Sequence, residues 1–272
     1  MHKQNIRGKY GSMKQLSFVF VFIFTLFLSA CHKDELINDC DLPYPDLLCK
    51  KYIFENNKCI GYIDYDYNTC LQKLHEAYKN TKGLVRKTIL FAYNAQGMIS
   101  EEQQIVTHSD ISDIKKYHYN PLNKIEKIEY FTNDTYTGVK QFYYSNNSLL
   151  QKISIFTEKQ LDTLIIFEYD TDGKLWRQSY FNKDSSLVSQ QIHQFFDNGV
   201  ERIMLYNANF VYLGYLLIRT NNMGDILSTA TYSRNDELLE KTIFEYDNNK
   251  LIKETKLDGC EQVVAYNVYF YS

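Results

Sequence analysis

Side chains that could act as catalysts or metal ligands are scattered along this 272-residue chain and form no recognised catalytic motif. The six histidines form neither a His-x-x-x-His nor a His-Glu-x-x-His pair, and no Gly-x-Ser-x-Gly elbow, P-loop or dinucleotide fingerprint occurs. Asp170, Asp172 and Gly173 begin like a calcium loop, but Leu175 and Trp176 follow where further acidic ligands are needed. We therefore predict no catalytic residue, no metal site and no cofactor, and a hairpin turn at these residues.

Carboxylates and tyrosines are the side chains that could still bind or transform a ligand. Paired carboxylates hydrolyse glycosidic bonds, but the acids here recur at turns and exposed strand positions, where solvation explains them. The 24 tyrosines could stack on sugar rings or on a partner's side chains; alternatively, they pack the faces of a sheet. Trp176 follows Leu175 on the opposite face of a strand and is the candidate for an exposed contact.

Five cysteines could take part in thiol chemistry within the folded body. Four are clustered at spacings of 9, 10 and 11 residues, which fit no common zinc pattern: Cys40, Cys49, Cys59 and Cys70. In an oxidising compartment they could form two disulfides in any of three connectivities. Cys260 is then expected to be a lone buried or turn thiol.

The first thirty residues predict an export signal. Basic residues precede an apolar run of thirteen residues that ends at Leu28, and no acid occurs before Asp34. As a helix the run would reach about 20 Å, short of the roughly 30 Å hydrocarbon core of a bilayer. It therefore suits a signal peptide over residues 1–30 better than a membrane span, with Met1 or Met13 as the start.

The end of this run, Leu28-Ser29-Ala30-Cys31, resembles the lipobox of bacterial lipoproteins. The resemblance implies cleavage before Cys31 and a diacylglyceryl group on its thiol. Such an anchor is stable because two or more acyl chains keep a protein on a membrane, whereas a single chain binds reversibly. The alternative is an ordinary signal peptide with a chance cysteine.

Two further short motifs resemble signals of lipoproteins and glycoproteins in one phylum of Gram-negative gut and oral bacteria. Lys33-Asp34-Glu35 resembles a surface-export signal, and Asp162-Thr163-Leu164 resembles an acceptor for O-glycosylation at Thr163. The expected location is the outer membrane, on the cell surface or on the periplasmic leaflet.

The charge of the mature chain argues against a nucleic-acid partner. Four of the 30 Lys and Arg residues lie within residues 1–30, which leaves 26 against 33 acids and a formal charge of −7. Nucleic-acid binding depends on neutralising phosphates with Lys and Arg. The expected partners are the membrane, through the lipid, and a glycan or another envelope protein.

A tandem repeat organises the rest of the chain. The segment Tyr169-Asp170-Thr171-Asp172-Gly173-Lys174-Leu175 has close or weaker copies at intervals of 25 or 26 residues, beginning at Tyr67, Tyr93, Tyr119, Tyr144, Phe195, Thr220 and Tyr246, with a last anchor at Tyr271. A second aromatic two residues before most anchors shares a strand face with the anchor, because side chains alternate. The Asn/Asp/Gly cluster that follows reverses the chain, so each unit is expected to be a hairpin.

For one segment of the repeat, helix propensity and the alignment of the repeats make different predictions. Residues 71–78 have the composition of an amphipathic helix, but the repeat aligns them with the return strand that starts at Leu175. Because neighbours decide β pairing, we predict a strand here.

The recurring Tyr169-Asp170-x-x-Gly173-x-Leu175 pattern resembles the YD repeat of RHS-type proteins over roughly residues 67–271. The resemblance implies a strand–turn–strand meander that can spiral into a shell. Full shells of that family enclose a toxin but need far more than eight repeats.

The expected architecture is all-β: an antiparallel meander of tandem hairpins of about 25 residues that forms a large curled sheet, a spiral or a partly closed barrel. Its parts are a signal peptide (1–30), a tether behind Cys31 (31–50), an N-terminal cap hairpin (51–66) and a repeat domain of about eight units (67–272). A transmembrane barrel is not expected, since lysines and acids are spread along the strands.

The function expected from these features is a non-catalytic envelope lipoprotein whose tyrosine-rich repeat surface is a scaffold for binding or adhesion. One alternative is a glycan-active enzyme with carboxylates in a groove of the sheet. Another is an accessory or immunity-type protein linked to an RHS-type toxin. The sequence sets no oligomeric state.

Overall fold

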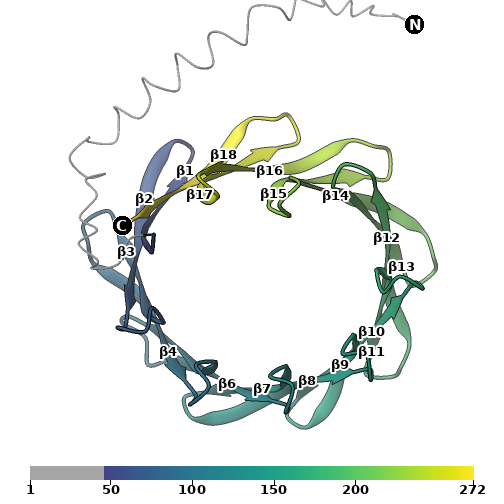
Figure 1. The fold of residues 1–272 in the computed structure, drawn as a ribbon, viewed down its shortest axis with the longest axis horizontal. Coiled ribbons are helices and arrows are strands. Elements are labelled where there is room, and N and C mark those ends of the chain that lie inside the picture. The colour runs from purple at the N-terminus through teal and green to yellow at the C-terminus, as the bar shows by residue number, and fades with distance from the viewer. Residues whose placement is uncertain (1–45) are drawn as a thin grey trace, which may run out of the picture. The chain divides into compact units, whose positions relative to one another are not determined.

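The structure is a computed structural model that describes residues 46–272, and these residues form eighteen β-strands and no helix (Figure 1). Within this part of the chain no helix could cross a membrane. The strands are β1 (Leu48–Glu55), β2 (Lys58–Tyr67), β3 (Lys73–Asn80), β4 (Val85–Tyr93), β5 (Ile99–Val106), β6 (Ser112–Tyr119), β7 (Ile125–Thr132), β8 (Thr135–Tyr144), β9 (Leu150–Thr157), β10 (Gln160–Tyr169), β11 (Leu175–Asn182), β12 (Leu187–Phe196), β13 (Val200–Asn207), β14 (Tyr212–Thr220), β15 (Ile226–Ser233), β16 (Leu238–Asp247), β17 (Lys250–Asp258) and β18 (Val263–Tyr271). The predicted antiparallel meander is confirmed.

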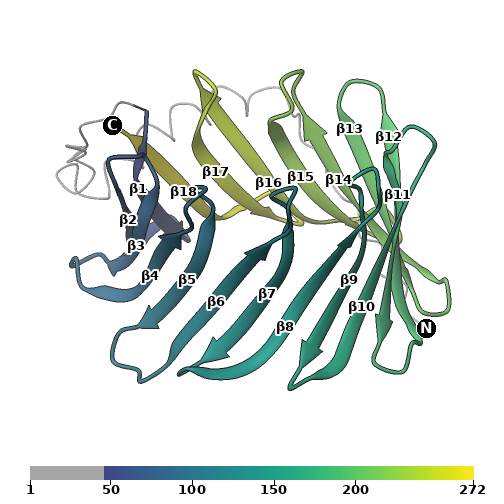
Figure 2. The same cartoon turned by 60° about the horizontal axis from the view of Figure 1, so that its bottom comes forward.

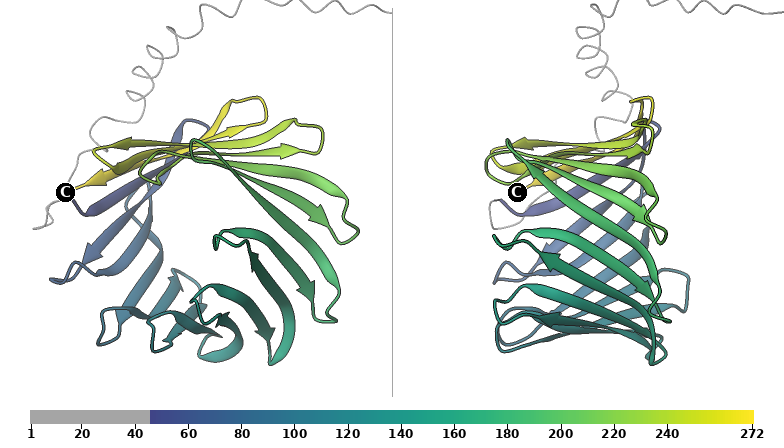
Figure 3. Two further views of the ribbon diagram at one scale, coloured as in Figure 1. Left: turned by 45° about the vertical axis from the view of Figure 1, so that its right-hand side comes forward. Right: turned by 90° about the vertical axis from the view of Figure 1, so that its right-hand side faces the viewer.

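The meander closes on itself. Each strand pairs with the next one along the chain, and β1 pairs antiparallel with β18 from Leu48↔Tyr271 to Glu55↔Ala265. Every strand therefore has two neighbours, and Figures 1 and 3 show an unbroken wall of tilted strands. The curled sheet and the spiral are wrong, and the barrel is fully rather than partly closed. Closure is favoured because it removes both unpaired sheet edges.

Closure also corrects two predicted domain boundaries. Residues 51–66 are not a cap: they belong to β1 and β2, which are ordinary wall strands with partners on both sides. The tether predicted over residues 31–50 is too long, because β1 already begins at Leu48. The predicted signal peptide and Cys31 lie outside the described residues.

Successive strands run in opposite directions, so the turns that join them lie alternately at the two rims of the barrel. Both ends of the described chain meet at one rim, where the Asp46 N–H donates to the Ser272 carbonyl at 2.9 Å and the Ser272 N–H donates to the Leu47 carbonyl at 3.0 Å. This rim, which we call the lower rim although Figure 2 draws it at the top, also carries the turns that follow the tyrosine anchors. The upper rim carries the turns within the hairpins β1–β2, β3–β4 and their successors.

A side-chain oxygen holds most of the lower turns together. In the reference unit the Asp170 carboxylate accepts the Asp172 N–H at 3.0 Å and the Lys174 N–H at 2.8 Å. Asn94 and Asn120 accept the equivalent pairs of N–H groups through their amide oxygens. Because the turn needs a hydrogen-bond acceptor rather than a charge, Asn can replace the Asp of the repeat and keep both hydrogen bonds.

The tyrosine anchors bind the backbone of the neighbouring strand. The Tyr93 hydroxyl donates to the Lys73 carbonyl at 2.8 Å, the one at Tyr119 to Ile99 at 2.8 Å and the one at Tyr169 to Leu150 at 2.7 Å. The same bond recurs at Tyr67, Tyr144, Tyr246 and Tyr271. We call these bonds the tyrosine locks; each satisfies a carbonyl at the start of a strand.

Register overrides helix propensity at residues 71–78, as predicted. Residues 73–80 form β3, which pairs with β2 and β4. Tyr78 then faces Ile63 on one side and Lys87 on the other. A strand here costs little because both of its edges are paired.

The barrel has no dry core among its described residues. Its most buried side chains, Phe54 and Tyr52, retain 2% and 4% exposure, and none falls below 2%. Stability therefore rests on the closed backbone ladder, on cross-strand contacts and on the tyrosine locks rather than on a packed interior.

We predict that Tyr93→Phe lowers the free energy of unfolding by about 1 kcal/mol, because it removes one half-buried hydrogen bond and leaves the Lys73 carbonyl unsatisfied. Urea unfolding with a constant m-value measures the change. The matched control is Tyr143→Phe, whose hydroxyl bonds Gln141 on an exposed surface. An equal loss in both variants would contradict a specific role for the locks.

Candidate functional site

Two observations identify the sheet face that carries the tyrosine anchors as the inner wall of the barrel. Lys51 on β1 approaches Glu254 on β17 at 3.9 Å although β18 lies between them, as expected where a concave face brings side chains together. Burial raises the pKa of tyrosines all along this face, including Tyr65, Tyr117, Tyr130, Tyr180 and Tyr269. On the outer face burial has this effect at Tyr215.

Three clusters on the inner wall share one arrangement, a glutamate that accepts a hydrogen bond from a tyrosine and pairs with a lysine. Glu76 accepts from the Tyr78 hydroxyl at 2.9 Å and pairs with Lys73. Glu102 accepts from Tyr117 at 3.1 Å and from the Lys115 ammonium at 2.5 Å. Glu254 accepts from Tyr269 at 2.8 Å and lies near Lys51. We call these the Glu–Tyr clusters.

The clusters hold their tyrosines in the neutral form. Burial, then the charge of Glu76 and the hydrogen bond to it, raises the pKa of Tyr78 to about 12. The same causes raise the pKa values of Tyr117 and Tyr269. Each phenol donates its single hydrogen to its glutamate, so the hydrogen bond fixes the positions of the hydroxyl oxygen and the carboxylate on the inner wall.

A recess of about 250 Å³ lies beside the second cluster and is formed by β5, β6, β7 and the start of β8. It is lined by Glu102, Gln104, Asp113, Ile114, Lys115, Tyr130, Phe131, Thr132 and Thr137. Glu102 is held by Lys115 and Tyr117, and Asp113 accepts the Thr132 hydroxyl at 2.8 Å. Two carboxylates, an amide, an ammonium and a phenol ring in so small a space suit a ligand with several hydroxyl groups.

The opposite sector of the inner wall has a mixed surface. Ile153, Ile165 and Ile203 are at most 9% exposed. Gln178 and Gln191 face each other on the same side of the sheet, and His193 pairs with Glu201 at 2.7 Å. Polar side chains therefore occur on both sides of the barrel, and we call the part around the recess, over β5 to β8, the polar sector.

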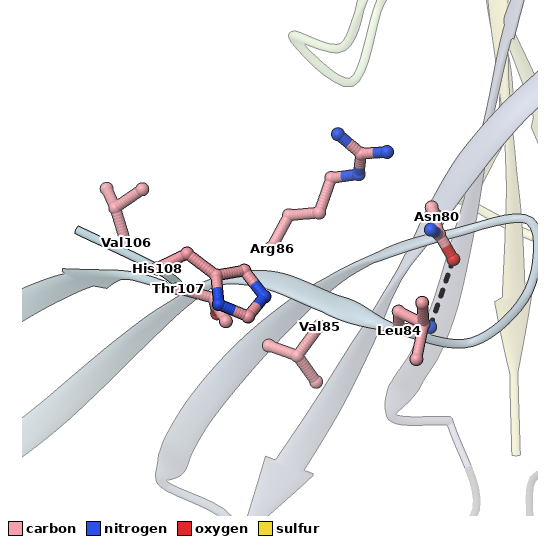
Figure 4. A pocket seen from close by; sticks show the side chains of 7 residues that line it. All are labelled: Asn80, Leu84, Val85, Arg86, Val106, Thr107 and His108. Carbon is pink, nitrogen blue, oxygen red and sulfur yellow. Dashed lines mark hydrogen bonds between the residues drawn. The ribbon is translucent and has the colours of Figure 1, made fainter.

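A second pocket of about 470 Å³ lies at the upper rim, between the turn that joins β3 to β4 and the turn that follows β5 (Figure 4). We call it the rim pocket; it is lined by Asn80, Leu84, Val85, Arg86, Val106, Thr107 and His108. The Asn80 side-chain oxygen accepts the Leu84 N–H at 3.0 Å and shapes the first of these turns.

The two residues singled out from the sequence lie apart from this site. Trp176 is the extra residue of a bulge at the start of β11; it is 37% exposed, with the Arg177 guanidinium 4.5 Å from its ring centroid. Thr163 lies within β10 on the inner wall, and its hydroxyl donates to Asp162 at 2.9 Å. Exposed contact at Trp176, glycosylation at Thr163 and lipidation of Cys31 stay predictions.

The residues of the recess were missed because they come from four strands. Nothing in the local sequence links Tyr130 to Glu102 or Asp113. The signal that could have found them is register: inner-face positions of successive units that hold acids instead of the usual aromatic or aliphatic residue, as Glu102 does opposite Phe91.

The cysteines follow the prediction in part. Cys49 is disulfide-bonded and Cys260 is an exposed turn thiol, as predicted. Two disulfides among the four clustered cysteines are wrong, because Cys70 is an exposed free thiol in the lower turn after β2. Cys59 lies near the start of β2, at the opposite end of this strand from Cys70 and well beyond the reach of a disulfide. Residues 46–272 contain no group of three potential metal ligands.

Comparison with known proteins gives distant likenesses. No protein-family model and no curated protein matches the chain. Among solved structures it is similar to a porin-like protein from Bacteroides uniformis ATCC 8492, with 11% identity and a TM-score of 0.48 over 84% of this chain and 98% of that one. It is also similar to a porin-like protein from Bacteroides vulgatus ATCC 8482, with 8% identity and a TM-score of 0.31 over 84% of this chain and 99% of that one. The TcdB2-TccC3-Cdc42 structure has 10% identity and a TM-score of 0.31 over 78% of this chain and 15% of that one. Similarities this low carry no argument about function.

We predict that alkaline pH destabilises the barrel. The pKa of Tyr78 rises from 10 to about 12 on folding, so the folded protein holds more protons above pH 10 and the stability from this group is lost as pH rises to about 12. Glu76→Gln lowers this pKa and should make the loss smaller. Urea unfolding between pH 9 and 12 measures it, with Glu168→Gln, which breaks the ion pair to Arg177 on the outer face, as control. A Glu76→Gln profile parallel to the wild type would refute the assignment.

Proposed function

We propose that this protein is a non-catalytic, membrane-anchored binding protein of the bacterial envelope, and that the polar sector of its inner wall binds a glycan. The observation that carries the proposal is the recess beside Glu102, where acids, an amide, an ammonium and the Tyr130 ring converge. Sugars present hydroxyl groups to such donors and acceptors and an apolar ring face to aromatic side chains. The tyrosine hydroxyls of the Glu–Tyr clusters donate their hydrogens to the glutamates, so their oxygens add acceptors on the same wall.

Charge on both faces supports a barrel that stands clear of the bilayer. The outer face carries pairs such as Lys79–Asp64 at 2.6 Å and Arg177–Glu168 at 2.6 Å, and the inner wall carries Lys115–Glu102. A barrel embedded in lipid needs an apolar outer band, since Lys or Arg at the bilayer midplane costs about 2–4 kcal/mol. The proposed attachment is therefore the lipid on Cys31.

Glycan binding is tested on the chain from residue 31 onward, carrying Cys31→Ser so that it stays unlipidated. We expect binding on a glycan array, and about two- to tenfold weaker binding to the same ligands by Tyr130→Ala, because a stacking contact of about 0.5–1.5 kcal/mol is lost from the recess. Tyr143→Ala, on the outer face and 40% exposed, should bind as the wild type does. An array without any bound glycan would refute the proposal, and release of products from a bound glycan would favour the glycan-active enzyme.

The anchor is tested separately by fractionating cells that express the full chain or its Cys31→Ser variant. We expect the wild type in the membrane fraction, labelled by a fatty-acid probe, and the variant unlabelled and soluble after export, because its thioether donor is gone. A wild-type protein without fatty acid would refute the anchor while leaving the binding site untouched.

A further inference from the structure

The disulfide of Cys49 joins the barrel to a cysteine that precedes its first strand. The chain has six cysteines, and Cys49 is disulfide-bonded. The other cysteines of residues 46–272 form no disulfide: Cys59, Cys70 and Cys260. The partner of Cys49 is therefore Cys31 or Cys40, both of which lie outside the described residues.

Cys49 occupies a position at which other strands of the barrel expose their side chains. It is the second residue of β1 and the extra residue of a bulge opposite Phe270. The equivalent extra residues at the starts of β3, β11 and β15 are 42%, 37% and 41% exposed: Leu74, Trp176 and Leu227. Cys49 is 7% exposed. A bonded segment that covers this side of the bulge accounts for the difference.

Two considerations select Cys40 over Cys31 as the partner. Cys40 lies nine positions before Cys49 and Cys31 lies eighteen, so Cys40 closes a loop of half the length. This favours closure about threefold, because the entropy of loop closure depends weakly on length. The second consideration is stronger: a sulfur that carries the proposed diacylglyceryl group is a thioether, and a thioether forms no disulfide.

We propose that Cys40 and Cys49 form a disulfide that fastens the tether of the membrane anchor to strand β1. The bond forms after export by thiol–disulfide exchange with an oxidised dithiol oxidoreductase of the envelope. One cysteine thiolate attacks the disulfide of that enzyme, and the other then displaces it. The two protons and two electrons of the thiols pass to the enzyme, which leaves as a dithiol. The choice of partner rests on the proposed lipid at Cys31, whereas the bond at Cys49 does not.

The disulfide determines where a pull on the tether acts on the barrel. Without it, the load enters at Asp46, which is held to the end of β18 by the hydrogen bond from its N–H to the Ser272 carbonyl at 2.9 Å. With it, the load enters at Cys49, within the ladder between β1 and β18. Since the pairing of these two strands closes the barrel, the disulfide protects the contact on which closure depends.

Peptide mapping of the exported full chain tests the assignment. Protein isolated from membranes is alkylated in denaturant without reductant, digested and analysed by mass spectrometry. We expect a cross-linked species that joins the peptides of Cys40 and Cys49 and disappears on reduction. Cys31 should carry the lipid, and the remaining cysteines should be alkylated.

The other outcomes separate this inference from the proposed anchor. A cross-link between Cys31 and Cys49 would overturn both. Alkylation of both Cys40 and Cys49, or a cross-link of Cys49 to a cysteine other than these two, would overturn the disulfide alone. A Cys40–Cys49 cross-link without lipid on Cys31 would overturn the anchor and leave the disulfide standing.

Urea unfolding of the exported chain from residue 31 with Cys31→Ser measures the effect of the bond. We expect reductant to lower the unfolding midpoint of this protein to that of its Cys40→Ser variant, because a cross-link restricts the unfolded chain. The midpoint of Cys40→Ser should not respond to reductant. Cys260→Ser, which replaces an exposed turn thiol, is the matched control and should behave as the parent does. A parent midpoint that reductant leaves unchanged would overturn the stabilising role of the disulfide.

Discussion

Hydrogen bonding around a closed ring is the constraint on which the rest of this structure depends. The pairing of β1 with β18 leaves no free sheet edge in the described chain, and the ladder then holds each strand at a fixed tilt and register. Because no side chain of this region is buried as deeply as in a packed core, a sheet with open edges would have little else to stabilise it. Closure also creates the inner wall, and with it any site that depends on side chains converging from several strands.

The repeat tolerates variation because its turn and its tyrosine lock each require one kind of hydrogen-bonding atom rather than a particular residue. The turn needs an acceptor, which Asp170, Asn94 and Asn120 all supply. The lock needs a hydroxyl, and where the anchor is Thr220 its shorter side chain still bonds the Gly199 carbonyl at 3.0 Å. Most other positions are free to change, so an acid such as Glu102 can stand on the inner wall opposite Phe91.

The fold was largely predictable and the candidate site was not. Regular spacing of Tyr93, Tyr119 and their equivalents determines hairpins of one length, and alternation determines which residues share a face. Whether the sheet closes depends on β1 meeting β18 across almost the whole chain, a contact that no local pattern encodes. The recess has the same origin, because Glu102, Asp113 and Tyr130 become neighbours only through the register of three strands.

The antiparallel seam restricts how such a barrel can change in size. Removing one strand would make the first and last strands run in the same direction and abolish their present pairing, so growth or loss must occur by whole hairpins. Since the diameter of a barrel grows roughly in proportion to its number of strands, the lumen can widen or narrow only in discrete increments of two strands. Duplication of a single 25-residue unit would thus add two strands and widen the lumen, so that related barrels could accommodate molecules of a different diameter.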